Sequence, residues 1–311
     1  MVRILVLGAG GVGGYFGGRL VERGLDVTFL LRPSRAEHIA RHGLVIKSSA
    51  GDAKLAVKTL VRADCYTSYD FILLTCKAYD LDAAVEAICP AVGEGTVIVP
   101  ALNGLSHLTY LNQRFGQKRV LAGSVLIQAT LSSEGEVCHL NDEAYGLFGG
   151  QEAGSCQAAK RWAALFDRAL GVKIHAVSDA MQVMWDKWVR LASLAGITCL
   201  MRANIGEINS AFGGREATMT LLHANQKIAQ AAGYALSETR LCAIANFLLD
   251  NQSKASASML RDMERGARTE ADHILGDLLQ KARDYQLENP LLALAYTHVK
   301  AYEERRRAGR L

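Results

Sequence analysis

The stretch that decides the fold is Val2-Arg3-Ile4-Leu5-Val6-Leu7-Gly8-Ala9-Gly10-Gly11-Val12-Gly13, near the start of a 311-residue chain. Its first half is, apart from Arg3, an apolar run typical of a buried strand, and its second half fits G-x-G-x-x-G. In this motif the first glycine permits a tight turn, the second lets the backbone approach a pyrophosphate, and the third lets a helix pack closely on the strand. The helix that follows directs its positive end at the anion. The pattern predicts a dinucleotide site at Gly8, Ala9, Gly10, Gly11, Val12 and Gly13; the alternative is a glycine-rich turn that binds no ligand.

Outward from this loop, strands and helices alternate. Helix-compatible sequence runs to about Arg23, and an apolar strand follows at 27–31. Together these elements take about 30 residues, the size of one βαβ unit. The same reasoning predicts a helix over 80–89 and further strands, at 43–47, 55–60, 70–75 and 96–99. Such alternation indicates a mostly parallel sheet with helices on both faces.

From residue 120 the pattern changes to short strands, and later to helices alone. Runs at 120–130, 136–140 and 144–148 predict an antiparallel extension of the sheet, followed by a helix at 156–170. After Asp179, a possible N-cap, helical spacing places Met184, Trp188, Leu191 and Ala195 on one face. Further helices are predicted, at 214–232, 237–263, 270–284 and 290–305. We therefore predict an α/β fold in which an N-terminal Rossmann-type domain, 1–178, is followed by an all-α domain, 179–311.

Charge and cysteine content exclude several function classes. The chain has 35 Lys and Arg against 31 Asp and Glu, a net charge of +4, and the last twelve residues account for +3 of it. The rest is nearly neutral, so we expect no nucleic-acid partner and no basic membrane face. The seven cysteines form no C-x-x-C pair, which argues against a disulfide framework and a zinc site and favours buried small hydrophobes. The longest uncharged apolar stretch of the second half, 191–201, is short of the ~20 residues that span a bilayer. Together with the cysteine pattern, this leads us to expect a cytoplasmic protein that binds no metal.

The residues after the second strand indicate which dinucleotide is bound. NAD-specific sites usually carry an acid there, to bind the ribose. This chain instead has Arg32 and Arg35 and no acid. Arginine suits the additional phosphate of NADP through charge-assisted hydrogen bonds. We therefore predict NADP(H), with Arg32 at the phosphate; a solvated loop arginine is the alternative.

Several further motifs, taken in order, resemble one family. They are Leu74-Thr75-Cys76-Lys77-Ala78-Tyr79, Asn103-Gly104, Trp185-Asp186-Lys187, Ser258-Met259-Leu260-Arg261-Asp262 and Arg268-Thr269-Glu270. Over nearly its whole length the chain resembles the ketopantoate reductases (2-dehydropantoate 2-reductases). The resemblance implies an NADPH-dependent oxidoreductase that reduces the 2-oxo acid ketopantoate to pantoate, a step of pantothenate biosynthesis. It leaves a homodimer open as the assembly.

The resemblance also assigns roles to single residues. Lys187 matches the general acid, Glu270 matches the active-site glutamate, and Ser258 matches a serine that holds the substrate carboxylate. Lys77 and Asn103 match residues that line the nicotinamide and substrate side of the cleft, which the second domain helps to close. The alternatives are structural: a lysine extending from an amphipathic helix, an acid favoured in a first helical turn, and a plain polar serine. The Thr269 to Asp272 spacing reads as the T-x-x-D start of that helix.

Three departures from the family pattern bear on the substrate. Leu191, Ala195 and Ala255 occupy positions where the family commonly carries asparagines, the last on the same helical side as Ser258. Apolar side chains favour an apolar substituent, so we expect a 2-oxo acid less polar than ketopantoate. Two other functions stay open. One is a dehydrogenase of the 3-hydroxy-acid type, and the other is a non-catalytic NADP-binding sensor.

Overall fold

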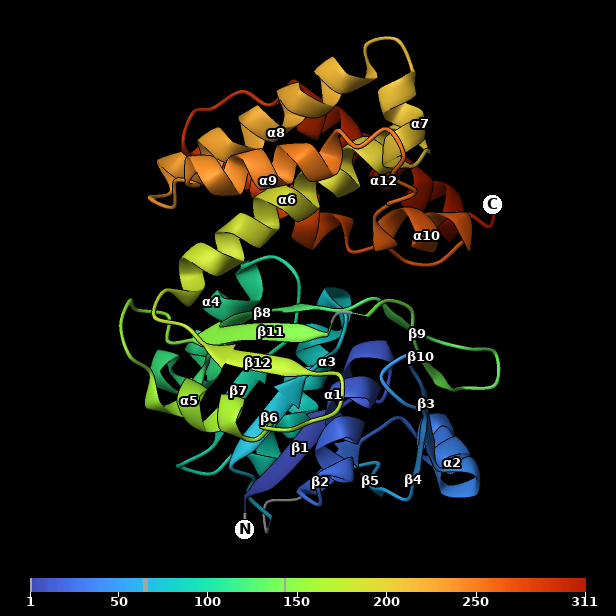
Figure 1. Cartoon of the computed structure of the whole chain (residues 1–311), viewed down its shortest axis with the longest axis vertical. Coiled ribbons are helices and arrows are strands. Elements are labelled where there is room, and N and C mark those ends of the chain that lie inside the picture. Colours follow the sequence, from blue (N-terminus) through green and yellow to red (C-terminus); the bar gives the residue numbers. More distant parts are fainter. Residues whose placement is uncertain (1, 64–66, 143) are drawn as a thin grey trace. The chain divides into compact units, whose positions relative to one another are not determined.

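A five-stranded parallel sheet organises the amino-terminal part of the chain (Figure 1). The computed structural model describes residues 2–63, 67–142 and 144–311. The strands are β1 (Arg3–Leu7), β2 (Asp26–Leu30), β5 (Lys58–Leu60), β6 (Phe71–Leu74) and β7 (Val97–Pro100), in the order β5-β2-β1-β6-β7. The order reverses between β1 and β6, and open α/β sheets bind ligands beyond the carboxyl ends of the strands at such a point. The predicted parallel sheet is confirmed.

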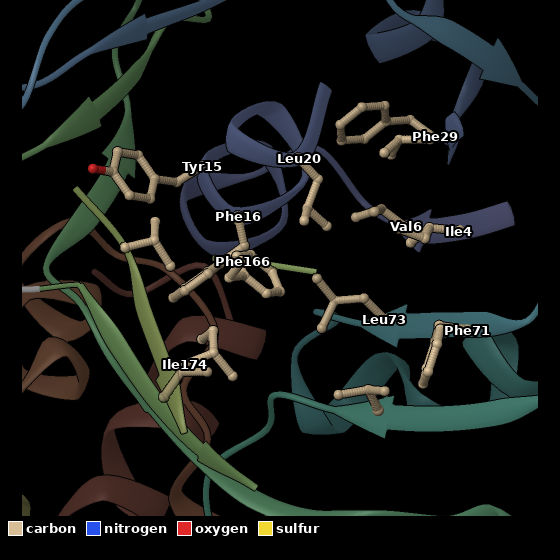
Figure 2. Packing of buried hydrophobic residues seen from close by; sticks show 14 of the residues in the cluster. Ile4, Val6, Tyr15, Phe16, Leu20, Phe29, Phe71, Leu73, Phe166 and Ile174 are labelled. Atoms are coloured by element: carbon tan, nitrogen blue, oxygen red, sulfur yellow. The ribbon is translucent and has the colours of Figure 1, made fainter. Parts of the chain in front are cut away.

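Helix α1 (Gly11–Glu22) packs on this sheet because one of its faces is apolar. Phe16 and Leu20 are buried against a cluster that includes Val6 of β1 and Leu73 of β6, as Figure 2 shows. Two helices were not predicted from the sequence: α2 (Pro33–His42), which follows β2, and α4 (Ser106–Phe115), which follows β7. The predicted helix over 80–89 is present as α3 (Leu81–Ile88).

Two smaller sheets replace the predicted antiparallel extension. One contains β3 (Leu44–Lys47), β4 (Ala53–Leu55), β9 (Ala129–Leu131) and β10 (Val137–His139), and the other contains β8 (Ala122–Leu126), β11 (Tyr145–Gly149) and β12 (Lys173–Ala176). The prediction was wrong in part, because β10 pairs parallel with β3 and β11 pairs parallel with β12. The predicted strand 55–60 is also two strands, since β4 pairs with β3 whereas β5 joins the edge of the main sheet. Helix α5 (Gln157–Ala164) is shorter than predicted, and β12 follows it.

The chain divides into two compact units. Unit 1 comprises Met1–Leu102 and His107–Val183, and unit 2 comprises Asn103–Ser106 and Met184–Leu311. Unit 2 is helical, as predicted. Its helices are α6 (Ala180–Met201, whose first turn belongs to unit 1), α7 (Ile205–Ser210), α8 (Gly214–Ala231), α9 (Glu238–Leu248), α10 (Ser258–Glu264), a π-helical turn η4 (Asp272–Gly276), α11 (Asp277–Asp284) and α12 (Pro290–Arg307).

The predicted helix over 237–263 is wrong, because the chain leaves helical geometry between Leu248 and Ser258. Asp250 accepts a hydrogen bond from the backbone N–H of Gln252 at 2.9 Å, a local turn that competes with the helix. Met184, Trp188 and Ala195 of α6 are buried as predicted, whereas Leu191 is only partly buried.

The cysteines are less buried than predicted. Of the six in the described part of the chain, only Cys199 is buried and Cys242 is exposed; Cys65 lies outside the described residues. No grouping of His, Cys, Asp and Glu suited to a metal ion occurs within residues 2–63, 67–142 and 144–311. None of the helices in the same ranges has the length and apolarity to cross a bilayer.

Candidate functional site

The glycine loop between β1 and α1 has the geometry of an anion cradle. Gly8 has φ +95°, a backbone conformation that L side chains rarely adopt, and Gly13 lies so close to the carbonyl of Gly8 that a Cβ would clash. A Cβ on Gly10, by contrast, would meet no atom within 4 Å among the described residues. Gly10 is the N-cap of α1, and neither a capping side chain nor an acidic residue occupies the first turn. The free N–H groups and the helix dipole therefore suit a pyrophosphate.

The end of β6 lies against this loop. Thr75 donates a hydrogen bond from Oγ1 to the Leu7 carbonyl at 2.8 Å, and the same oxygen would lie 3.2 Å from a Cβ on Gly8. Lys77 is the N-cap of the 3₁₀ turn η1 (Ala78–Asp80). It follows a strand, as predicted, and lies in unit 1.

The two arginines after β2 have different surroundings. Arg32, the N-cap of α2, is 79% exposed and pairs with Asp80 at 2.7 Å. Arg35 donates from Nε to the Ala9 carbonyl at 3.1 Å and from Nη1 to the Gly135 carbonyl at 2.7 Å. Burial lowers the pKa of Arg35, and its buried Nη2 has no hydrogen-bond partner among the described residues. Arg35 thus presents a partly desolvated donor beside the glycine loop, a position that the sequence indicated without assigning it a contact.

Lys187 lies on α6 in surroundings that disfavour its charge. Burial and, to a smaller extent, the nearby Arg190 lower the pKa of Lys187 to about 8, against the opposing effect of Glu270. An amine with a pKa near neutrality can donate and accept a proton in the physiological range.

Glu270 directly precedes the helical segment that begins at Ala271, and it is 7% exposed. The predicted T-x-x-D start forms only in part: the Thr269 hydroxyl accepts from the Ala271 N–H at 3.4 Å, whereas Asp272 bonds to Tyr296 at 2.6 Å and to Lys300 at 2.9 Å. Within unit 2 the π-turn η4 also contacts α6, since Trp188 donates from Nε1 to the Ile274 carbonyl at 2.9 Å. The neighbours of Lys187 and Glu270 are therefore linked by a buried hydrogen bond. Sequence reasoning missed this link, for which no sequence signal exists.

Asn103 follows β7, as predicted, and belongs to unit 2. The next residue, Gly104, has φ +74°, and a Cβ there would lie 2.8 Å from the His273 carbonyl. Ser106 contacts Nδ1 of His273 at 3.0 Å and also hydrogen-bonds to Asp277. The loop that carries Asn103 is thereby fixed against η4 and the start of α11, close in sequence to Glu270.

Ser258 is the first residue of α10, with Ala257 as N-cap. Ala255 lies in the preceding loop, where its carbonyl accepts from the Ile205 N–H at 3.0 Å. The prediction that Ala255 and Ser258 share a helical face is therefore wrong, because the helix begins after Ala255. Ala195 is fully buried and Leu191 is partly buried on α6.

The structure thus distributes the predicted residues between the units. Unit 1 holds the glycine loop, Arg32 and Lys77, whereas unit 2 holds Lys187, Glu270, Asn103 and Ser258. Within unit 2, Lys187 and Glu270 are close enough for the carboxylate to influence the pKa of the amine. The glycine loop and the pair Lys187 and Glu270 are therefore each built within one unit.

Comparisons with known proteins agree with one another. The family model described as ketopantoate reductase PanE/ApbA matches residues 4–148, and the model of its C-terminal part matches residues 179–303. The chain is 34% identical to the uncharacterized oxidoreductase YkpB of Bacillus subtilis (strain 168), over 97% of this chain and 99% of that protein. It is 27% identical to the crystal structure of 2-dehydropantoate 2-reductase from Geobacter metallireducens GS-15, with a TM-score of 0.88 over 96% and 99% of the chains. The ternary structure of D-mandelate dehydrogenase with NADH and anilino(oxo)acetate has the same fold, with 20% identity and a TM-score of 0.89 over 98% and 99% of the chains.

Proposed function

The chain belongs to the ketopantoate reductase family of NAD(P)-dependent oxidoreductases, and from this premise we propose that it uses NADPH to reduce a 2-oxo acid to a 2-hydroxy acid. The substrate is ketopantoate, which would give pantoate, or a less polar analogue. The observation that carries the proposal is Lys187, an amine whose pKa is lowered to about 8 beside a buried carboxylate, Glu270. Perturbed titratable groups of this kind mark catalytic sites.

In this proposal Lys187 stabilises the developing charge and donates the proton, and Glu270 adjusts the pKa of Lys187. NADPH, when bound, supplies the hydride to the ketone carbon. Negative charge then develops on the ketone oxygen, where the Lys187 ammonium stabilises it and donates the proton. Glu270 keeps Lys187 from losing its proton too readily, because its carboxylate raises the amine's pKa against the effect of burial. Asn103 and Ser258 provide the amide and hydroxyl that bind the substrate, Ser258 at its carboxylate.

The pH dependence of the reaction tests the role of Lys187. Ketone reduction requires the protonated amine, so kcat should be constant at low pH and fall by about tenfold per unit above about 8, where Lys187 loses its proton. Oxidation of the 2-hydroxy acid requires the neutral amine, so kcat for oxidation should rise with pH up to about 8 and then become constant. We would measure initial rates in both directions from pH 6 to 10. A reduction rate that keeps rising above pH 9 would exclude Lys187 as the donor.

The glycine loop and the two arginines support NADPH as the cofactor. Gly10 leaves room for the pyrophosphate, and Gly8, Ala9, Gly11, Val12 and Gly13 complete the loop around it. Arg32 has an exposed guanidinium next to the end of β2, and Arg35 adds an unpaired donor beside Ala9. No acid stands after β2 to bind a free ribose.

The contribution of Arg32 is measurable. Because a hydrogen bond to a charged group contributes about 1.5–3 kcal/mol, Arg32→Ala should raise KM for NADPH by about 10–100-fold and leave KM for NADH unchanged. Arg41→Ala is the matched control, since Arg41 is also exposed, at 73%, and lies in the last turn of the helix that Arg32 precedes. Equal effects of Arg32→Ala on the two cofactors would show that Arg32 does not bind the additional phosphate.

The substrate pocket is proposed to accept an apolar group. Leu191, Ala195 and Ala255 offer no amide to a polar substrate, and Leu191 is the partly buried one on the helix of Lys187. D-Mandelate dehydrogenase, which shares the fold, has been solved with anilino(oxo)acetate, a compound with an aromatic ring. These observations support aryl or branched-alkyl 2-oxo acids as substrates.

A further inference from the structure

The last helix of unit 2 supports the segment that carries Glu270. Thr269, the residue before Glu270, donates from Oγ1 to Oε1 of Glu303 on α12 at 2.6 Å. The other oxygen of Glu303, Oε2, accepts from Nζ of Lys300 at 2.9 Å. Both Thr269, at 4%, and Glu303, at 8%, are buried. A carboxylate and a hydroxyl in such surroundings are stable only if their hydrogen bonds are made.

The same lysine also supports the chain on the other side of Glu270. Nζ of Lys300 donates to Oδ1 and Oδ2 of Asp272 at 2.9 and 3.1 Å, and the Tyr296 hydroxyl donates to Oδ1 at 2.6 Å. Although burial works in the opposite direction, hydrogen bonds from Tyr296 and Lys300 lower the pKa of Asp272. Asp272 is therefore held as an anion beside Lys300.

These contacts give Glu270 two anchors. Thr269 stands one residue before it and Asp272 two residues after it, and both lead to the Lys300–Glu303 pair. The backbone at Glu270 is thus fixed at two points by a rigid helix, which is what a catalytic carboxylate needs to hold its position. Neither Lys300 nor Glu303 has a place in the proton transfer itself.

We propose that Glu303 and Lys300 are positioning residues that set the location of the Glu270 carboxylate relative to Lys187. The inference rests on the proposed function for its catalytic meaning. Its physical content, that Glu303 acts on Lys187 through Glu270, is independent of the substrate.

A double-mutant cycle tests this dependence. Glu303→Gln keeps the size of the side chain and an acceptor for Thr269, but it removes the anion beside Lys300. We expect it to lower kcat by about tenfold in the otherwise unchanged enzyme and to have no further effect in Glu270→Gln, because residues that act through one another are not additive. Glu304→Gln is the matched control, since Glu304 neighbours Glu303 in sequence and is 61% exposed in a pair with Arg307. It should change kcat by less than about twofold.

A second readout does not need activity. Glu270 raises the pKa of Lys187, so an NMR titration of the Lys187 amine should show its pKa lowered by Glu270→Gln. It should also be lowered by Glu303→Gln and by Thr269→Val, but not by Thr269→Ser, which keeps the hydroxyl, or by Glu304→Gln. If Glu270→Gln lowers this pKa and Glu303→Gln and Thr269→Val do not, the positioning inference is wrong, whatever the substrate. If the pKa values shift as expected and no 2-oxo acid is reduced, the inference stands and the proposed function fails.

Discussion

Replacing Lys187 with alanine should lower kcat for ketone reduction by about 10²–10⁴-fold, the loss expected when a general acid is removed. This corresponds to about 3–5 kcal/mol of transition-state stabilisation. The effect should be large because the ammonium acts on charge that exists only in the transition state, in surroundings that lower its pKa to about 8. Affinity for NADPH should be nearly unchanged, since the glycine loop belongs to unit 1 and Lys187 to unit 2.

The measurement combines kcat with the NADPH dissociation constant from cofactor fluorescence. Lys227→Ala serves as the control, because Lys227 is an exposed lysine of α8 in the same unit. Its kcat should match that of the unaltered enzyme. Full activity in Lys187→Ala would remove Lys187 from the mechanism and leave it as a structural lysine.

The second large effect concerns the substrate. We expect kcat/KM for an aryl or branched-alkyl 2-oxo acid to exceed that for ketopantoate by about 10–10³-fold, because the absence of amides at Leu191, Ala195 and Ala255 leaves hydrogen bonds of a polar substrate unmade. Each missing bond costs about 0.5–3 kcal/mol, and three positions lack the amide. Competition between the two substrate types in one assay gives the ratio directly.

A single substitution should shift this preference. Leu191→Asn restores an amide at a partly buried position on α6, one helical turn beyond Lys187. We expect it to raise kcat/KM for ketopantoate and lower it for the apolar acid. Leu200→Asn is the control, since Leu200 is also partly buried and lies nine residues further along, on the opposite side of the helix. Strong turnover of ketopantoate by the unaltered protein, with none on apolar acids, would refute the substrate proposal.

The part of the fold nearest the glycine loop was the most predictable from sequence. The run at 4–7 is continuously apolar, as expected for a strand buried on both faces, and the loop that follows has spacing that few other structures need. The predictions were less accurate where the pairing of distant strands decides which sheet a segment joins. Residues 55–60 form one β-like run in sequence but serve two sheets, and no local signal marks the change between Leu55 and Lys58.

Helix boundaries in unit 2 show the same limit. The break after Leu248 has a local cause, the turn at Asp250, which sequence reasoning passed over because the flanking residues keep helical spacing. The error also displaced Ala255 from the face of Ser258. The π-turn at Asp272–Gly276 has no local sequence signal, and its contacts with Trp188 and Tyr296 join residues distant in the chain.

The residues of the candidate site were proposed from the family resemblance and stay predictions, and the electrostatics around them had no signal in the sequence. Family resemblance selected Lys187 and Glu270, yet their roles stay predictions that experiment must test. The lowered pKa of Lys187 comes mainly from burial in the folded chain, which the local sequence does not report. The anchoring of Thr269 by Glu303 likewise joins residues 34 positions apart, a contact that the Thr269 to Asp272 spacing obscured by resembling a helix cap.

One measurement tests the central claim most directly. NADPH oxidation by the full chain should be followed across a panel of 2-oxo acids that includes ketopantoate and aryl and branched-alkyl compounds. In a parallel assay, reduction of NADP⁺ should be followed with 3-hydroxy acids as substrates. The account predicts that at least one 2-oxo acid is reduced to its 2-hydroxy acid, with NADPH preferred to NADH. Tight NADPH binding without turnover of any 2-oxo acid, or turnover confined to 3-hydroxy acids, would contradict it.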